Sequence, residues 1–173
     1  MARFSIIFIV LVISLFTLEL FEPIRQAIIL PFTGFLATFS AAIMQIFDAD
    51  VVSHADIIRS KSTAAAVQIA AGCNGVEAVI ILFAAIFAFP SSFMHKIIGF
   101  IFGFFAIQIL NVIRIISLYY LLQWDKNWFE WFHLYLWQAL IILDALIVWL
   151  IWLRYLPKKL SNADKAEATE IHS

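Results

Sequence analysis

Five apolar stretches, each nearly free of charge, constrain this sequence more than any other feature. They cover residues 5–20, 27–47, 77–93, 97–123 and 128–153. A helix needs about 20 apolar residues to cross roughly 30 Å of hydrocarbon. Because a bilayer offers backbone groups no hydrogen-bond partner, these stretches should be helices. With 64% hydrophobic and 13% charged residues, the chain is predicted to be an all-α integral membrane protein. We expect a single domain over residues 1–157, a bundle of about five transmembrane helices.

The distribution of Lys and Arg predicts the orientation of this bundle. Lys96 lies between the third and fourth stretches, and Arg154 precedes a short tail over residues 158–173 that adds further lysines. The opposite face carries fewer basic residues, namely Arg59, Lys61 and Lys126, and aspartates near them offset their charge. Cytoplasmic loops are enriched in Lys and Arg. The face with Lys96 and the tail is therefore predicted to be cytoplasmic.

The N-terminal topology has two solutions. If residues 5–20 and 27–47 both cross the bilayer, residue 1 lies outside. If residues 27–47 are re-entrant or lie along the outer interface, residue 1 lies inside with Arg3. Residues 48–71 form the longest polar segment and are expected outside, before the third helix. Their Val and Ile content suits a short hairpin.

Charge and cysteine counts exclude several classes of function. With 11 Lys+Arg against 12 Asp+Glu, the net charge is −1. No basic field exists to hold nucleic acid. The mean hydropathy of +0.99 predicts that the chain lies in the lipid bilayer. The single cysteine, Cys73, forbids an internal disulfide and any metal site built from several cysteines. Neither a metal nor a cofactor is expected.

Cys73 lies between two glycines, just before the third stretch, in the sequence Gly72-Cys73-Asn74-Gly75. Glycines allow a tight turn and a close approach of the backbone. A thiol at the N-terminus of a helix feels the positive end of the helix dipole, which should lower its pKa. The N–H groups of Asn74 and Gly75 could form an oxyanion hole. This pattern suits a nucleophile, although a lone cysteine taken by itself is more often a small residue that only packs.

Arg114 is the only charge in the fourth stretch. Gln108, Asn111 and Arg114 follow one another at intervals of three residues, which places them along one helix face. A charged side chain within a bilayer costs at least a few kcal/mol, so it is a candidate for function. The alternative is a structural ion pair between Arg114 and Asp144 or Glu77.

His133 lies about one turn into the last stretch, beside Glu130 and Trp131. Its aromatic neighbours are typical of a membrane interface, and a histidine there can be a plain interface residue. Topology nevertheless places His133, Cys73 and Arg114 on the outer side, at the near ends of three consecutive helices. A nucleophile, a proton carrier and a charge stabiliser at one level are what thiol-mediated acyl transfer requires.

At these residues the sequence resembles the exosortase/archaeosortase family of membrane cysteine transpeptidases. The family pattern is a Cys followed by a small polar residue and Gly, then Asn-x-x-Arg on a helix, then a His on a later helix. These motifs appear here as Cys73-Asn74-Gly75, as Asn111 to Arg114, and as His133. The similarity covers about residues 31–157 and is close to exosortase H, one of the short forms.

The resemblance implies a reaction and a partner. The enzyme would cleave exported proteins at a C-terminal tripartite signal: a short motif of the Ile-Pro-Thr-Leu type, an apolar helix and a basic end. Cys73 would hold the substrate as a thioester before transfer to a surface acceptor. His133 would shuttle protons, and Arg114 would stabilise the oxyanion or orient the substrate. Asn74, Gly75 and Asn111 would bind substrate or support the catalytic groups.

The same resemblance implies the bacterial cytoplasmic (inner) membrane, with the active site facing the periplasm. Two other functions stay open at this point. One is a non-enzymatic transporter or assembly subunit, in which Arg114, Asp144 and Glu77 form structural ion pairs within the membrane. The other is a thiol acyltransferase that acts on lipid or peptidoglycan through the same three residues. The substrates, the acceptor, the choice between hydrolysis and transfer, and the oligomeric state are open as well.

Overall fold

The computed structural model describes residues 2–70 and 72–155 of the chain. The helical elements are α1 Ala2–Leu20, α2 Glu22–Ile24, the π-helical segment η1 Arg25–Ile29, α3 Leu30–Met44, α4 Val76–Ala88, α5 Phe93–Trp124, α6 Lys126–Trp131, the π-helical segment η2 Phe132–Leu136 and α7 Trp137–Arg154. The strands are β1 Val51–His54, β2 Ile57–Ser60 and β3 Ala66–Gln68. The short tail expected over residues 158–173 lies outside the described residues.

Among the described residues, four helical runs are long and apolar enough to cross a membrane. They are Arg3–Leu20, Glu22–Met44, Phe93–Trp124 and Lys126–Arg154. α4 is also apolar but has only 13 residues. It ends at Ala88 rather than near residue 93, because Pro90 disfavours the helical conformation of Phe89, whose φ is −76° and ψ 136°. The predicted helical membrane bundle is confirmed.

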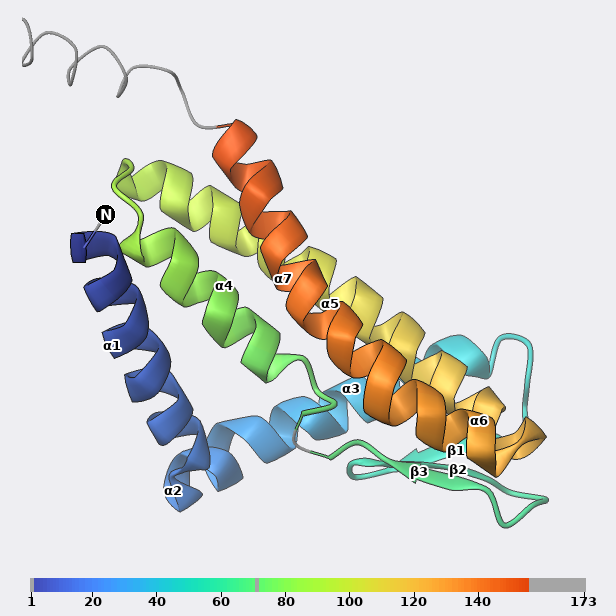
Figure 1. Ribbon diagram of the computed structural model, residues 1–173. Helices are drawn as coiled ribbons and strands as arrows, with labels where there is room; N and C mark the ends of the chain where they lie inside the picture. The colour runs from blue at the N-terminus through green and yellow to red at the C-terminus, as the bar shows by residue number, and fades with distance from the viewer. Residues whose placement is uncertain (1, 71, 156–173) are drawn as a thin grey trace, which may run out of the picture.

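α1, α4, α5 and α7 form the bundle (Figure 1). α1 begins where α4 ends, since the ring centroid of Phe4 lies 6.2 Å from those of both Phe89 and Trp149. We call the end with residues 89–92, between α4 and α5, the turn end, and the opposite end, which carries the strands, the sheet end. The core between α4, α5 and α7 consists of apolar side chains, namely Ala78, Leu82, Ile86, Ile107, Ala145 and Trp152.

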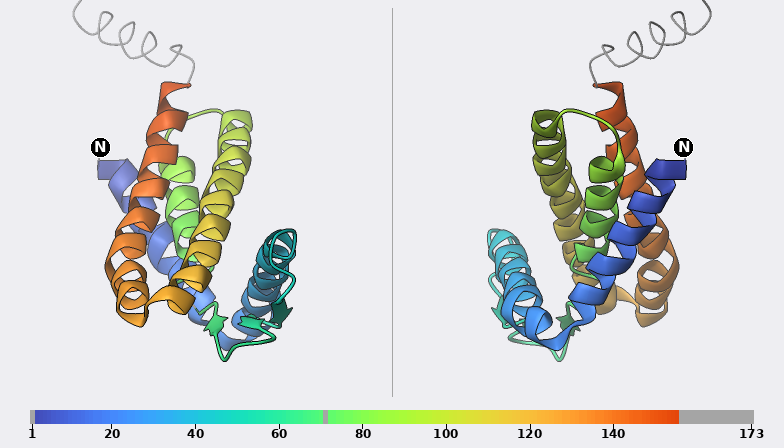
Figure 2. Two further views of the ribbon diagram at one scale, coloured as in Figure 1. Left: turned by 90° about the vertical axis from the view of Figure 1, so that its right-hand side faces the viewer. Right: turned by 90° about the vertical axis from the view of Figure 1, so that its left-hand side faces the viewer.

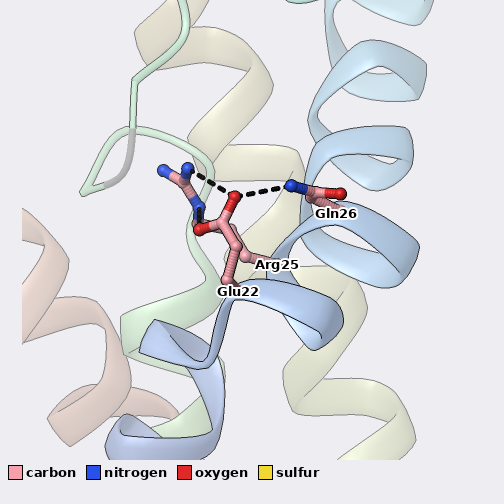
Figure 3. Close-up of polar contacts among 3 residues, drawn as sticks. All are labelled: Glu22, Arg25 and Gln26. Atoms are coloured by element: carbon pink, nitrogen blue, oxygen red, sulfur yellow. Dashed lines mark hydrogen bonds and ion pairs between the residues drawn. The ribbon is translucent and has the colours of Figure 1, made fainter.

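α3 lies across the sheet end of the bundle and does not return to the turn end (Figures 1 and 2). Length and composition would allow Glu22–Met44 to cross a membrane, yet the chain turns sharply after α1. At this corner the Glu22 carboxylate accepts hydrogen bonds from Arg25 Nε at 3.0 Å and from Gln26 Nε2 at 2.7 Å (Figure 3). α3 therefore runs across the end of the bundle instead of returning alongside α1.

The three strands form an antiparallel sheet in the order β1-β2-β3. The expected hairpin is present as β1 and β2, and β3 adds a third strand. The sheet packs on α3 and α5 through a cluster of buried side chains: Leu36, Ala37, Ala41, Met44, Val51, Ile58, Ile69, Val112, Ile115 and Tyr119. The chain that leaves β3 leads within a few residues to Cys73 and the start of α4.

Candidate active site

The loop that carries Cys73 depends on its two glycines. Gly72 and Gly75 have φ angles of 83° and 75°, a region that side-chain-bearing residues rarely adopt. Gly75 caps the N-terminus of α4 and packs tightly on α5, where an added Cβ would lie 3.2 Å from Gln108 Nε2 and 3.3 Å from Asn111 Cγ. The sequence predicted both the tight turn and the close backbone approach.

The peptide groups beside Cys73 are held from two directions. The Gly72 N–H donates to Glu77 Oε1 at 2.5 Å, and the Gly72 carbonyl accepts from Arg114 Nη1 at 3.2 Å. Glu77 and Arg114 therefore fix the loop from the first turn of α4 and from α5. This contact gives Glu77 a positioning role, which sequence reasoning left open.

Asn74 anchors the loop to α3. Its side chain is only 1% exposed, and its Nδ2 donates to Thr33 Oγ1 at 3.2 Å. Its Oδ1 accepts from the Val76 N–H at 3.1 Å, which satisfies one free donor at the start of α4. Sequence reasoning missed Thr33, because a lone threonine in an apolar helix usually just bonds its own backbone, as Thr33 also does with the Ile29 carbonyl.

Arg114 is the largest fully buried side chain among the described residues, 1% exposed. Its Nη2 donates to Cys73 Sγ at 3.3 Å. Within residues 2–70 and 72–155 the ion pairs are Glu22–Arg25 and Lys126–Glu130, both exposed. Arg114 thus contacts the thiol and a backbone carbonyl, and the structural ion pair with Asp144 or Glu77 is not formed.

His133 reaches the same sulfur from η2, which follows α6 and leads into α7. After α5 the Asp125 carboxylate caps α6 by accepting two backbone N–H groups, and the chain turns back toward Cys73. The imidazole Nδ1 and Nε2 lie 3.9 and 4.0 Å from Cys73 Sγ. His133 belongs to the π-helical segment η2, a geometry often found at functional sites. Its ring stacks on Phe129, with 5.6 Å between centroids and 3° between planes.

A second group of polar side chains lies behind Arg114. Asn111 and Gln108 are 3% and 8% exposed, and neither amide has a hydrogen-bond partner among the described residues. Asn111, Arg114 and Asp144 line a space of about 10 Å³ between α5 and α7. Asn111 therefore supports Gly75 and borders Arg114 without contacting the sulfur.

A cavity of about 240 Å³ opens in front of Cys73. Its walls include Arg114, Phe129 and His133, and along one side residues 66–70 of the β3 segment. A reacting carbonyl placed there would meet the sulfur, the guanidinium and the imidazole together. No group of three or more His, Cys, Asp or Glu side chains in the described part of the chain could hold a metal ion.

The electrostatic balance at Cys73 differs from the sequence-based expectation. Burial raises the pKa of the Cys73 thiol above its usual range, the nearby Arg114 cation partly offsets this, and Glu77 adds to the rise. The predicted lowering by the helix dipole is wrong, because the cost of placing a thiolate in this buried loop exceeds the stabilisation from its surroundings. At neutral pH the sulfur therefore carries its proton and needs a base.

The fold and these contacts define a multi-pass membrane protein with one half-buried thiol between a guanidinium and an imidazole. The family model for transmembrane exosortases matches residues 1–151 of the chain. The chain belongs to this family, as its motifs predicted. Comparisons with curated proteins and with solved structures give no match.

Proposed function

We propose that the chain is a cysteine transpeptidase of the membrane, with Cys73 as nucleophile, His133 as proton carrier and Arg114 as charge stabiliser. One observation carries the proposal. The Cys73 sulfur lies 3.3 Å from the Arg114 guanidinium and 3.9–4.0 Å from the His133 imidazole. Nucleophile, base and cation are the parts required for acyl transfer through a thioester.

In the first half-reaction, His133 takes the proton of the Cys73 thiol as the sulfur attacks the scissile carbonyl. A C–S bond forms, and the carbonyl oxygen becomes an oxyanion. When the C–N bond breaks, His133 returns the proton to the leaving amine. In the second half-reaction, an acceptor nucleophile gives its proton to His133 as it attacks the thioester carbonyl, and the C–S bond breaks. His133 then returns that proton to the Cys73 thiolate. Water would give hydrolysis and an amine would give transfer.

Arg114 can stabilise both negative charges that arise in this cycle, the thiolate of Cys73 and the oxyanion. Its Nη2 faces the sulfur and can stabilise a thiolate, while its burial keeps the guanidinium in a medium where its field is weakly screened. Its Nη1 bond to the Gly72 carbonyl fixes the plane of the guanidinium. A lysine could not make both contacts in this geometry, because it is a single point donor on a flexible stem.

The proposed substrate and location follow from the family resemblance and the charge distribution. The substrate is an exported protein that ends in an Ile-Pro-Thr-Leu-type motif, an apolar helix and a basic end. The enzyme lies in a bacterial inner membrane, and the sheet end faces the periplasm, because Lys96 and Arg154 belong to the turn end. The motif would then meet Cys73 after export.

A processing assay tests this function. A reporter with the tripartite signal is co-expressed with the wild type, Cys73→Ala or Cys73→Ser, and cleavage is followed by the mass of the reporter. The wild type should cleave after export, and both variants should be inactive while remaining in the membrane fraction. Normal cleavage by Cys73→Ala would refute the proposal. A lipid acyl group found on Cys73 in place of the reporter would favour the acyltransferase alternative.

Sidedness is tested separately with a maleimide that does not cross membranes. Cys73 is the only cysteine, so labelling of intact spheroplasts reports its exposure alone. Labelling from the outside is expected. Labelling only after the membrane is broken would place the sheet end in the cytoplasm.

A further inference from the structure

β3 is an edge strand whose outer side faces the Cys73 cavity. The sheet order leaves β3 paired with β2 alone among the described residues. Two backbone bonds flank the ladder, Ile69 N to Asp56 O at 2.9 Å and Ser60 N to Ala65 O at 3.0 Å. In an antiparallel pair, alternate residues direct both backbone groups to the neighbouring strand. Ala65, Val67 and Ile69 are therefore the residues that face β2. Ala66 and Gln68, which alternate with them, direct their N–H and C=O groups away from β2.

A continuous groove follows this outer side. The cavity of about 240 Å³ runs from Cys73 along residues 66–70. A second cavity of about 440 Å³, lined by residues 63–66, Gln123 and Lys126, shares Ala66 and Leu122 with the first. The groove thus extends from the thiol, between β3 and α5, to the outer end of α5.

The walls of the groove favour a polypeptide backbone as its occupant. The exposed side chains on β3 are those of Ala66 and Gln68, and neither carries a charge. Val67 packs on the cluster between the sheet, α3 and α5. What β3 offers the groove is therefore a row of backbone donors and acceptors, which an extended peptide can pair with.

We propose that substrate binds by β-strand addition to β3, so that the residues before the scissile bond form a fourth strand that ends at Cys73. This inference rests on the proposed transpeptidase function. Residues 66–70 span about 13 Å at about 3.3 Å per residue, which suits a motif of four or five residues. A short recognition motif is thus read through its backbone and its fit to the groove.

The direction of the added strand follows from the two ends of the groove. One end is Cys73, beside the start of α4, where the apolar helix of the substrate must continue into the bilayer. The other end, at Ala66 and Lys126, opens at the outer rim of the molecule. The exported part of the substrate must leave through the outer rim, so the added strand runs parallel to β3.

Disulfide cross-linking tests docking without catalysis. In the Cys73→Ala background, Ala66→Cys or Gln68→Cys is combined with a synthetic peptide that carries the Ile-Pro-Thr-Leu-type motif, an apolar helix and a basic end. The peptide holds one cysteine, two or four residues before the cleavage point. The nearer cysteine should cross-link to Gln68→Cys and the farther one to Ala66→Cys. Reversed pairing would overturn the parallel direction, and the absence of both cross-links would overturn the proposal.

Backbone variants test the hydrogen bonds themselves. Gln68→Pro removes an outward N–H and leaves the ladder with β2 intact. Ser53→Pro is the matched control, because Ser53 on β1 directs its N–H away from β2 at the opposite edge of the sheet. Gln68→Pro should lower kcat/KM for the peptide threefold to tenfold, and Ser53→Pro should leave it within twofold. Equal values for Gln68→Pro and the wild type would contradict strand addition.

A substrate variant keeps the test independent of how the enzyme folds. A peptide with an ester in place of the amide opposite Gln68 loses one backbone donor, and the wild type should cleave it threefold to tenfold more slowly. Full cleavage of this peptide would refute strand addition while cysteine catalysis stands. Cleavage by Cys73→Ala together with normal cross-links would instead refute the proposed chemistry and keep the docking site.

Discussion

Each end of the bundle carries a histidine and a cation, but the two ends differ in how their polar groups are hydrogen-bonded. At the turn end, His95 Nδ1 bonds Ser92 Oγ at 2.5 Å, and Lys96 Nζ donates to the Phe87 carbonyl at 2.8 Å. Trp152 Nε1 donates to the His95 carbonyl at 3.0 Å. These bonds close the α4–α5 turn locally. The turn end therefore uses its histidine and lysine to complete the fold.

At the sheet end, polar groups converge without pairing off. Arg114 Nε, Glu77 Oε2 and both amides of Gln108 and Asn111 are buried without a hydrogen-bond partner among the described residues. Each such group costs about 1–3 kcal/mol. A membrane protein tolerates this cost where the groups serve a ligand or a reaction. Ser91 Oγ at the turn end is also unpartnered within the described part of the chain, but at the sheet end several such groups gather around a thiol, which is why we propose the site there.

Cavity size would have pointed to the wrong end. The turn end contains a cavity of about 660 Å³, larger than the one beside Cys73, but its walls are mostly apolar, with Gly99, Phe102 and Trp152 among them. An apolar hollow between helices that face lipid needs no ligand to explain it. The comparison shows that chemistry at the walls is the better guide to function than volume.

The largest contrast is expected between the two histidines. His133→Ala removes the base beside a thiol whose pKa burial has raised, so the rate of reporter cleavage should fall by about 10²- to 10⁴-fold. His95→Ala at the turn end should change it less than twofold. Initial rates in proteoliposomes measure both. Equal losses in the two variants would mean that the histidines act only through the fold.

The next largest difference is expected between Arg114, which is buried, and Lys96, which is half-buried. Arg114→Gln should lower the cleavage rate about 10²- to 10³-fold, as expected when a stabiliser of the oxyanion is lost. It should also raise the pKa of Cys73 further, because the cation that offsets burial is gone. Lys96→Gln should affect neither quantity. The pH profile of iodoacetamide alkylation measures the pKa, and an unchanged profile in Arg114→Gln would contradict the contact with the sulfur.

Two glycines separate activity from stability. At Gly75 an alanine would be strained by a φ of 75° and crowded by Asn111, and cleavage should fall about tenfold. At Gly99 an added Cβ would lie 2.1 Å from the Trp152 ring, so the indole must move at a cost of about 1–3 kcal/mol. Gly99→Ala should lower Tm in detergent, while its cleavage rate per folded protein should equal that of the wild type. A lower Tm with unchanged cleavage for Gly75→Ala, or slower cleavage per folded protein with unchanged Tm for Gly99→Ala, would contradict this expectation.

The smallest effect is expected at Glu77. Glu77→Gln keeps an acceptor for the Gly72 N–H but removes the negative charge that raises the pKa of Cys73. The pKa should therefore fall, and alkylation at neutral pH should become roughly threefold to tenfold faster. A slower reaction would mean that the lost charge loosens the loop more than it relieves the thiolate.

Much of the site could be predicted from residue type and topology. Helix periodicity placed Arg114 on the same face of α5 as Asn111, and both side chains line the same small space. The glycines around Cys73 likewise predicted a tight turn. The turn and the shared helix face could be predicted because local backbone geometry determines them.

Other features depended on tertiary packing. The anchoring of Asn74 by Thr33, the stacking of His133 on Phe129 and the π-helical turn of η2 join segments that no sequence period links. The position of α3 across the sheet end and the third strand β3 have the same origin. The raised pKa of Cys73 is the sharpest case, because the cost of burial can be assessed only once the loop is packed.

The central claim is that Cys73 becomes acylated by the substrate. The most direct measurement is the intact mass of the wild type, quenched in acid within the first turnover with the synthetic tripartite peptide. The expected result is an adduct equal in mass to the motif-bearing fragment, located on Cys73 and removed by hydroxylamine. Product formed in that turnover while Cys73 stays unmodified, or formed equally by Cys73→Ala, would contradict it.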